Sequence, residues 1–274
     1  MPLIDFDSHF TEFLHQWLEE NQDQFYDIAQ VELMMPEIFE QFTHQPASWL
    51  NGQTPFDYFE QITQPEELVA LMKDYLNQQV PLPELLLLRI AGLGLQAEES
   101  LCDLLLDARE GVEIRMLCIR LLNDIGSKRM MHTYINWQRA REDRDDLADF
   151  SLESLEDMGD EAMPYMLEAL EDANDTGREA LLSVLSRYPG HPETYDHLIR
   201  LFDALPERQA ILAAYLARLG DERALPLLME RAQEEGLKYL DYIELRAAIE
   251  ALGGEAPART FDEDPEYEAF FGLN

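Results

Sequence analysis

The chain has 274 residues, of which 46% are hydrophobic, and its 56 acidic residues against 20 lysines and arginines give a formal net charge of −36. A chain this acidic repels phosphate backbones and anionic membrane surfaces, so composition disfavours nucleic-acid and membrane binding through bulk charge. The hydrophobic content excludes general disorder and is sufficient for a large core.

The first 64 residues predict a helical cap rather than a repeat, because an array of repeats needs an atypical unit to cover its end. A first amphipathic helix is expected from five apolar residues at helical spacing: Phe10, Phe13, Leu14, Trp17 and Leu18. A second helix is expected over residues 25–42, interrupted or kinked at Pro36.

Residues 44–55 contain Pro, Ser and an Asn-Gly pair, which predicts a loop. The alternative to a simple cap is a dimer or ligand surface in this region that uses exposed Trp49 and Phe56.

Beyond residue 64 the chain carries six glycines at intervals of 30 to 33 residues, namely Gly94, Gly126, Gly159, Gly190, Gly220 and Gly253. Such a period is typical of stacked repeat proteins. A core position is expected four residues before each glycine, where five of the six residues are aliphatic: Ile90, Leu122, Leu155, Ser186, Leu216 and Ile249.

The unit from Asp221 to Gly254 shows the expected plan of one repeat. Asp221 is a natural N-cap, Gly236 ends a first helix, and a second helix closes at Gly253. Residues 97–126, 160–190 and 191–220 follow the same plan, the 160–190 unit least well. We expect each spaced glycine to follow the second helix in a left-handed conformation, which a Cβ would penalise.

The stretch LGDERALPLL, from Leu219 to Leu228, resembles the HEAT-repeat signature in the short form of phycobilisome-lyase-type HEAT-like proteins. A degenerate copy, MGDEAMP, runs from Met158 to Pro164, and the resemblance covers about residues 65–253. It implies a right-handed α-α superhelix. It implies little about function, because proteins with such repeats include scaffolds, inhibitors, a few lyases and a family of DNA glycosylases.

The tail after Gly254 mixes acids with aromatic residues, Phe261, Tyr267, Phe270 and Phe271. Most acidic termini are solvated. We expect this one to dock on the protein's own surface, with a partner groove as the alternative.

No motif for catalysis, cofactor binding or metal binding is recognisable. Glu12 and His15 form a single ExxH pair, whereas a di-metal bundle needs two such helices and further carboxylates. The segment 172–177 has Gly177 where a calcium loop needs it but Thr176 at an acidic position, so we expect a turn. Cys102 and Cys118 lie in apolar helical stretches, which indicates buried thiols in a reducing compartment.

One segment has a net positive charge, opposite in sign to that of the whole chain. Residues 115–144 hold seven cations and three acids interleaved with aromatic rings, and the candidate binding residues are Arg115, Arg120, Tyr134, Trp137, Arg139 and Arg141. HEAT-like glycosylases are similar in using a basic, aromatic-lined concave face. The alternative, which we favour, is intramolecular pairing of these cations with neighbouring acids.

The sequence therefore predicts an all-α protein: a cap over 1–64, a right-handed HEAT-like solenoid of five to six helix pairs over 65–253, and an acidic tail over 254–274. The preferred hypothesis is a non-catalytic scaffold without cofactor that binds a basic protein or peptide on its concave face. The alternative is a HEAT-like lyase or DNA-glycosylase-type enzyme that uses the 115–144 segment. Without a visible signal peptide, a cytoplasmic location is expected.

Overall fold

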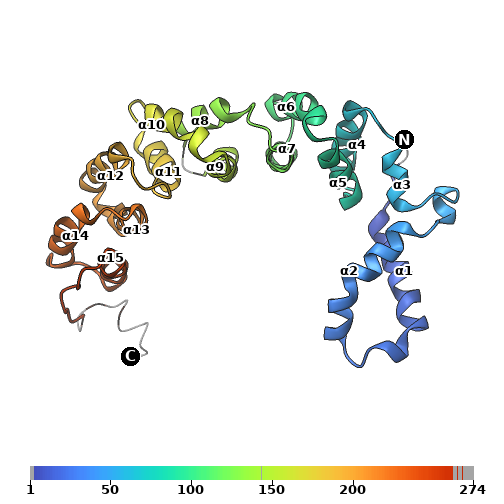
Figure 1. Cartoon of the computed structure of the whole chain (residues 1–274), viewed down its shortest axis with the longest axis horizontal. Coiled ribbons are helices and arrows are strands. Elements are labelled where there is room, and N and C mark those ends of the chain that lie inside the picture. The colour runs from blue at the N-terminus through green and yellow to red at the C-terminus, as the bar shows by residue number, and fades with distance from the viewer. Residues whose placement is uncertain (1–2, 143, 262–263, 265–266, 268–274) are drawn as a thin grey trace. The chain divides into compact units, whose positions relative to one another are not determined.

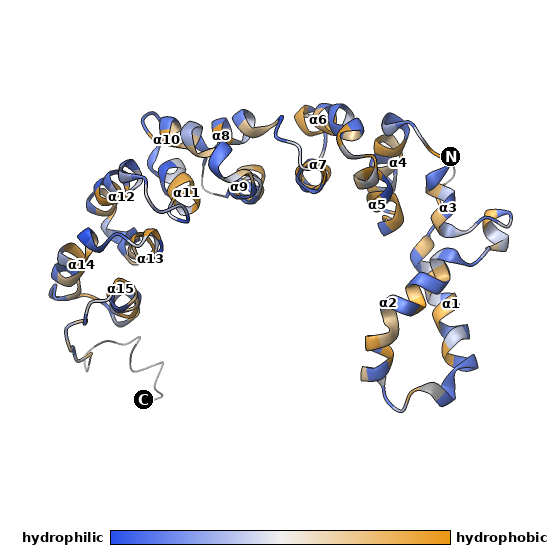
Figure 2. Cartoon of the chain, viewed as in Figure 1, coloured by the Kyte–Doolittle hydropathy of each residue, from blue (hydrophilic) through white to orange (hydrophobic). Residues whose placement is uncertain are grey.

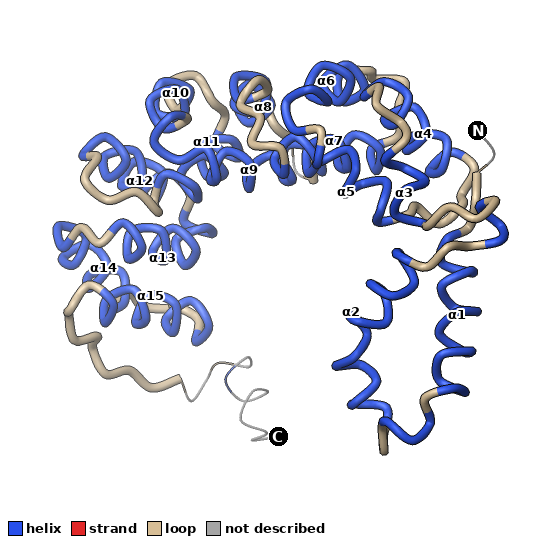
Figure 3. The backbone as a smooth tube through the Cα atoms, turned by 45° about the vertical axis from the view of Figure 1, so that its right-hand side comes forward, coloured by secondary structure: helices blue, strands red, loops and turns tan. Residues whose placement is uncertain are grey.

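A computed structural model describes residues 3–142, 144–261, 264 and 267. Within this part of the chain the regular structure comprises fifteen α-helices and six short 3₁₀ turns, without a β-strand (Figures 1 and 3). The predicted all-α class is confirmed. The chain divides into two compact units, Met1–Lys128 and Arg129–Asn274, which we describe separately. None of the described helices combines the length and apolar character needed to cross a membrane.

The first unit contains seven helices. They are α1 (Phe6–Glu20), α2 (Ile28–His44), α3 (Pro55–Glu60), α4 (Pro65–Asn77), α5 (Glu84–Gly92), α6 (Glu98–Leu106) and α7 (Val112–Asp124). Helices α1 and α2 lie side by side as a hairpin, joined by residues 21–27 at the end away from α3 (Figures 1 and 3). Asp5 and Asp27 begin the two helices as N-caps, accepting the backbone N–H of Ser8 and Gln30 respectively.

The base of the hairpin is held by aromatic packing. Phe6 is 4% exposed, and its ring lies 5.3 Å from that of Trp49, 5.7 Å from Tyr58 and 5.2 Å from Phe59. The opening residues also reach α4, because the Tyr75 hydroxyl donates to the Ile4 carbonyl at 3.0 Å. These contacts tie the predicted cap to the helices that follow it.

The described part of the second unit contains eight α-helices. They are α8 (Met131–Arg139), α9 (Asp146–Met158), α10 (Met163–Ala169), α11 (Asp175–Leu185), α12 (Pro192–Ala204), α13 (Gln209–Leu219), α14 (Leu225–Ala232) and α15 (Tyr239–Ala251). They form antiparallel pairs in two layers. The second helices of the pairs, α9, α11, α13 and α15, follow one another along one side, with α10, α12 and α14 on the other (Figure 1).

The predicted repeat boundaries correspond to helix pairs. The expected units 97–126, 160–190, 191–220 and 221–254 contain α6/α7, α10/α11, α12/α13 and α14/α15. Figure 2 shows that every helix carries both hydrophobic and hydrophilic residues, as expected for helices that bury one face. The six residues four positions before the spaced glycines are all buried, at 0–1% exposure, including Ser186.

All six spaced glycines have positive φ, between +56° and +101°. At Gly126 the turn is a Schellman motif, in which Gly126 N–H donates to Asn123 O at 2.8 Å and Ser127 N–H donates to Leu122 O at 2.9 Å. The positive φ was predicted from the spacing. The 160–190 unit departs from the pattern as expected, because its helix α11 ends at Leu185, well before Gly190.

The described part of the tail docks on the last helix pair, as expected. Phe261 is 8% exposed, with its ring 5.1 Å from that of Tyr242 and 5.3 Å from that of Tyr239. The Tyr242 hydroxyl donates to Pro257 O at 2.7 Å, and Arg259 donates to Ala232 O at 3.1 Å. Phe270 and Phe271 lie outside the described residues.

Helix α2 differs from its prediction. It begins at Ile28 rather than at residue 25, and it runs through Pro36 to His44 without interruption. Proline lacks the N–H that would bond the carbonyl of Glu32, four residues earlier. The buried side chains of Ile38 and Phe42, at 0% and 5% exposure, anchor the half of the helix beyond the proline.

Candidate functional site

The predicted binding residues of the 115–144 segment fall in both units. Arg115 and Arg120 lie on α7 in the first unit. Arg115 is half-buried and donates from Nε to the Leu105 carbonyl at 2.8 Å. Arg120 is exposed and lies 3.9 Å from the Asp124 carboxylate, one helical turn away. Both cations therefore have partners on their own helix pair.

Tyr134, Trp137 and Arg139 lie on α8 in the second unit. Tyr134 is 1% exposed, so its ring is part of the core and offers no stacking surface to a ligand. The half-buried Trp137 packs against it, with ring centroids 5.5 Å apart. Arg139 lies 3.3 Å from the Asp172 carboxylate, which belongs to the turn before α11.

Arg141 is a buried structural residue that joins three helices of the second unit. It is 8% exposed, it donates from Nη1 to Gln138 Oε1 at 2.9 Å, and it forms an ion pair with Asp149 on α9. Its carbonyl accepts a bond from the Asn174 amide at 2.9 Å, next to α11. Burial with these partners explains why a cation occurs in the core.

The hydrogen bond from Arg115 to the Leu105 carbonyl has counterparts in other helix pairs. In each, a side chain of the second helix caps the C-terminal end of the first helix. Arg178 Nε donates to Leu170 O at 3.0 Å in the α10/α11 pair, and Gln209 Nε2 donates to Phe202 O at 2.8 Å in the α12/α13 pair. The last carbonyls of a helix have no partner within that helix, so each bond satisfies one of them.

Neither the cysteines nor the acids form a metal site in the described structure. Within the described residues no three His, Cys, Asp or Glu side chains are close enough together to hold a metal ion. Cys102 and Cys118 form no disulfide and are buried, and burial raises the pKa of the Cys118 thiol to about 12. Residues 172–174 form the expected turn between α10 and α11, and Asn174 caps α11.

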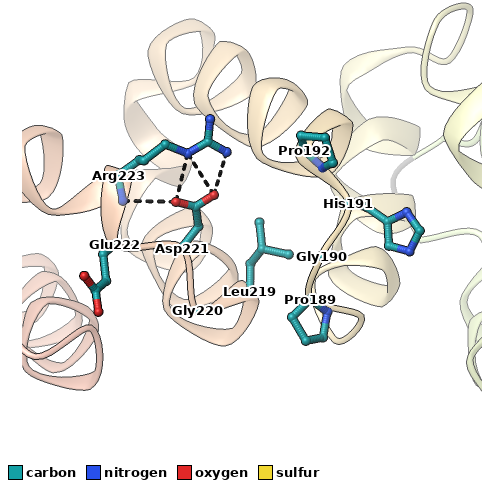
Figure 4. A pocket seen from close by; sticks show the side chains of 9 residues that line it. All are labelled: Pro189, Gly190, His191, Pro192, Leu219, Gly220, Asp221, Glu222 and Arg223. Atoms are coloured by element: carbon teal, nitrogen blue, oxygen red, sulfur yellow. Dashed lines mark hydrogen bonds and ion pairs between the residues drawn. The ribbon is translucent and has the colours of Figure 1, made fainter.

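A surface cavity of about 490 Å³ lies in the second unit between two successive repeat turns (Figure 4). Its lining comes from the turn before α12 and from the turn between α13 and α14: Pro189, Gly190, His191, Pro192, Leu219, Gly220, Asp221, Glu222 and Arg223. The spaced glycines Gly190 and Gly220 occupy equivalent places in the two turns. The cavity therefore lies where two of the turns with spaced glycines are adjacent.

The one cation of this cavity is already engaged. Arg223 donates to the Asp221 carboxylate at 2.6 Å and 3.0 Å, and its guanidinium lies 4.0 Å from the centre of the Tyr195 ring. The side-chain hydrogen bonds from Arg223 hold the pKa of Asp221 below its usual range. Figure 4 shows the His191 ring directed away from this pair.

The lining of this cavity offers polar groups and proline rings to a ligand. Its nine lining residues include no serine, threonine, cysteine or lysine that His191 could activate as a nucleophile. The Glu222 carboxylate and the two proline rings are exposed, and the His191 ring is half-buried. Such a surface suits a polar or cationic group of a larger ligand.

In the first unit, Trp49 is half-buried and carries His9 stacked on its face, at 4.0 Å and 6°. Phe56 is 43% exposed, as the alternative interpretation of the cap required.

The charge of the cap is a further feature of its sequence. Residues 1–72 contain fourteen acids and no lysine or arginine. The cap is thus an acidic segment without cations, a feature that pattern searches for catalytic motifs do not detect.

Comparisons with family models, with characterised proteins and with solved structures gave no significant match. The HEAT-like resemblance therefore stays a prediction, and the function has to be inferred from the residues described above.

Proposed function

We propose that the protein is a non-catalytic helical-repeat interaction protein that binds a basic protein or peptide. The observation that carries this proposal is the surplus of acid that the protein's own cations do not compensate. If each of the 20 cations paired with one acid, 36 acids would still be uncompensated. At least twelve cations are already committed to internal ion pairs: Lys73, Arg89, Arg109, Arg120, Arg139, Arg141, Arg178, Arg187, Arg208, Arg223, Arg231 and Arg246.

The internal pairing supports a cationic partner in two ways. It places an acid beside basic side chains that nucleic acid would otherwise contact, and the remaining acids leave a field that attracts positive ligands and accelerates their encounter. Layers of second helices such as α9, α11, α13 and α15 offer extended surfaces of the kind that repeat proteins use for binding. In the proposed superhelix this layer forms the concave face.

The proposal is tested by affinity capture with the full chain as bait. An unrelated acidic helical protein of similar net charge serves as the control bait. We expect basic proteins that bind this chain but not the control, and that dissociate as salt rises from about 0.05 to about 0.3 M. Recovery of acidic partners or of nucleic acid alone would contradict the proposal.

The HEAT-like lyase or glycosylase interpretation makes a different prediction. It requires that charge reversal of Arg115, Arg120 and Arg139 abolish an activity on DNA or on a tetrapyrrole. The non-catalytic proposal predicts no such activity in the wild-type chain. Because Arg115 caps α6, a folding check by circular dichroism has to accompany that variant.

A further inference from the structure

One face of α2 has the character of a docking surface. Leu33, Glu37, Glu40, Gln41 and His44 follow one another at helical spacing, so they form a single stripe along the helix. Leu33 is 82% exposed, which is unusual for a large aliphatic side chain. The other four residues line an open groove of about 490 Å³.

Apolar side chains mark both ends of this α2 stripe. At the His44 end, the His44 ring stacks on Phe56, which is 43% exposed, at 5.2 Å and 18°. At the other end, Tyr26 is 94% exposed just before the helix begins, close in sequence to Leu33. The stripe spans twelve residues from Leu33 to His44, and these two end residues lie about 16 Å apart along the helix axis.

The opposite side of α2 is occupied by the protein's own core. Ile38 and Phe42 are buried there. At the edge of the α2 stripe, the indole N–H of Trp17 on α1 donates to Gln41 Oε1 at 3.1 Å, so Gln41 also joins the two helices of the hairpin. Helix α2 is therefore held in place by α1 and α3, while the α2 stripe faces solvent. Figure 2 also shows hydrophobic residues on α2 near the end of the hairpin.

Charge decides which partner suits this face. The carboxylates of Glu37 and Glu40 lie between the apolar ends, in a segment of 72 residues that has no lysine or arginine. A second copy of the chain would bring identical acids together, which is unfavourable. A helix with apolar residues and interspersed cations would match both the apolar ends and the acidic centre.

We propose that the α2 stripe binds a basic amphipathic helix of a partner protein. Apolar side chains of that helix pack on Leu33 and Phe56, and its arginine or lysine side chains pair with Glu37 and Glu40. This inference rests on the proposed function and assigns it a second surface, on the cap, besides the layer of second helices. Three turns of partner helix, about 16 Å, are enough to cover the stripe.

The test uses the full chain and a synthetic amphipathic helix of about 18 residues with leucine on one face and arginine on the other. A second peptide carries glutamate in place of every arginine. Binding is followed by fluorescence anisotropy. We expect saturable binding of the arginine peptide and none of the glutamate peptide, and equal binding of the two would overturn the proposal.

Matched variants locate the binding surface. Glu37→Gln with Glu40→Gln should weaken binding of the arginine peptide about fivefold, and Leu33→Ala about tenfold. The control is Glu193→Gln with Glu230→Gln, which removes the same charge from exposed positions of α12 and α14. We expect less than about a twofold change for the control. All four positions changed to glutamine are solvent-exposed, so the fold should tolerate them.

The possible outcomes separate this inference from the proposed function. If the wild-type chain binds the arginine peptide but the α2 variants bind as tightly as the control, the assignment to α2 is wrong and the basic-partner proposal stands. If the wild-type chain fails to bind the arginine peptide, both fail. If sedimentation shows a dimer that Leu33→Ala dissociates, the stripe binds a second copy instead.

Discussion

The guanidinium of Arg115 donates a hydrogen bond from Nε to the carbonyl oxygen of Leu105, 2.8 Å away, and thereby caps the end of α6 from the first turn of α7. Arg178 and Gln209 do the same in later repeats. A residue that stands out in the sequence as a cation in an acidic chain is thus a structural element of its helix pair.

Replacing Arg115 by methionine keeps the aliphatic stem but removes the donors. We expect the free energy of unfolding to fall by about 1.5–2 kcal/mol, because a half-buried carbonyl loses a charged partner. The matched control is Arg120→Met, whose exposed ion pair at 3.9 Å should contribute less than about 0.5 kcal/mol. Urea unfolding followed by circular dichroism measures both, and equal effects would refute the capping role.

Gly177 sits where α11 packs closely on the end of α8. A Cβ at this position would lie 2.0 Å from the backbone oxygen of Gln138, so Gly177→Ala should cost about 2–3 kcal/mol. Gly111→Ala is the control, since its Cβ would meet nothing within 4 Å and its φ is −63°. We expect a change of less than about 0.5 kcal/mol there. Thermal or urea unfolding distinguishes the two, and a tolerated Gly177→Ala would contradict the close packing.

Gln79 ends α4 in a conformation that usually requires glycine. Its φ is +55°, and its N–H donates to Leu76 O at 3.2 Å while Val80 N–H donates to Tyr75 O at 3.1 Å, the same motif as at Gly126. We expect Gln79→Gly to raise the free energy of unfolding by about 0.5–1 kcal/mol. Gln78→Gly, at φ −92°, should lower it. A loss of stability in both variants would be inconsistent with strain at Gln79.

Pro36→Ala should stabilise α2, because alanine restores the N–H that bonds the Glu32 carbonyl. The expected gain is about 2 kcal/mol in local stability, which slower amide hydrogen exchange over residues 28–44 would report. Pro65 occupies the first position of α4, where no intrahelical bond is lost. Pro65→Ala should therefore change exchange in α4 little, and unchanged exchange in α2 for Pro36→Ala would disprove the prediction.

The Cys118 thiol should stay protonated in the folded chain, since burial raises its pKa to about 12. A raised pKa means that this thiol contributes stability below its unfolded pKa, and that the contribution is lost as pH rises from about 9 towards about 12. At pH 8 the native protein should react slowly with a thiol reagent such as Ellman's reagent, and rapidly in urea. Fast reaction of the native chain would show that the thiol is accessible.

Much of the fold could be predicted from spacing alone. The interval between the glycines reflects a physical requirement for positive φ after a helix, and the residue four positions earlier is buried even where it is Ser186. Because the positive φ and the buried position recur in successive helix pairs, the residues that meet these requirements recur at a regular interval in the sequence. Of the two outcomes expected at Pro36, interruption is wrong, because packing of Ile38 and Phe42, which is tertiary, offsets a local cost.

The candidate site was less predictable. The sequence displays the charges of Arg139 and Arg141 but not their partners, because Asp172 is distant in sequence and Asp149 belongs to the next helix. Tyr134 likewise reads as an available ring, yet the packing of α8 buries it. The acidic cap needed no structure to be noticed, only a count of cations along the chain. The exposure of Leu33, which locates a docking surface within this acidic cap, could be seen only in the structure.

The absence of lysine and arginine before Lys73 also shapes how the molecule can be handled at the bench. Trypsin has no cleavage site there, so peptide mapping with this enzyme would report nothing about the α1–α2 hairpin, however exposed its backbone is. A glutamate-specific protease would cut the peptide bonds after Glu37 and Glu40, the residues proposed to pair with the partner helix. Slower cleavage at these two bonds in the complex would therefore map the position of the bound helix.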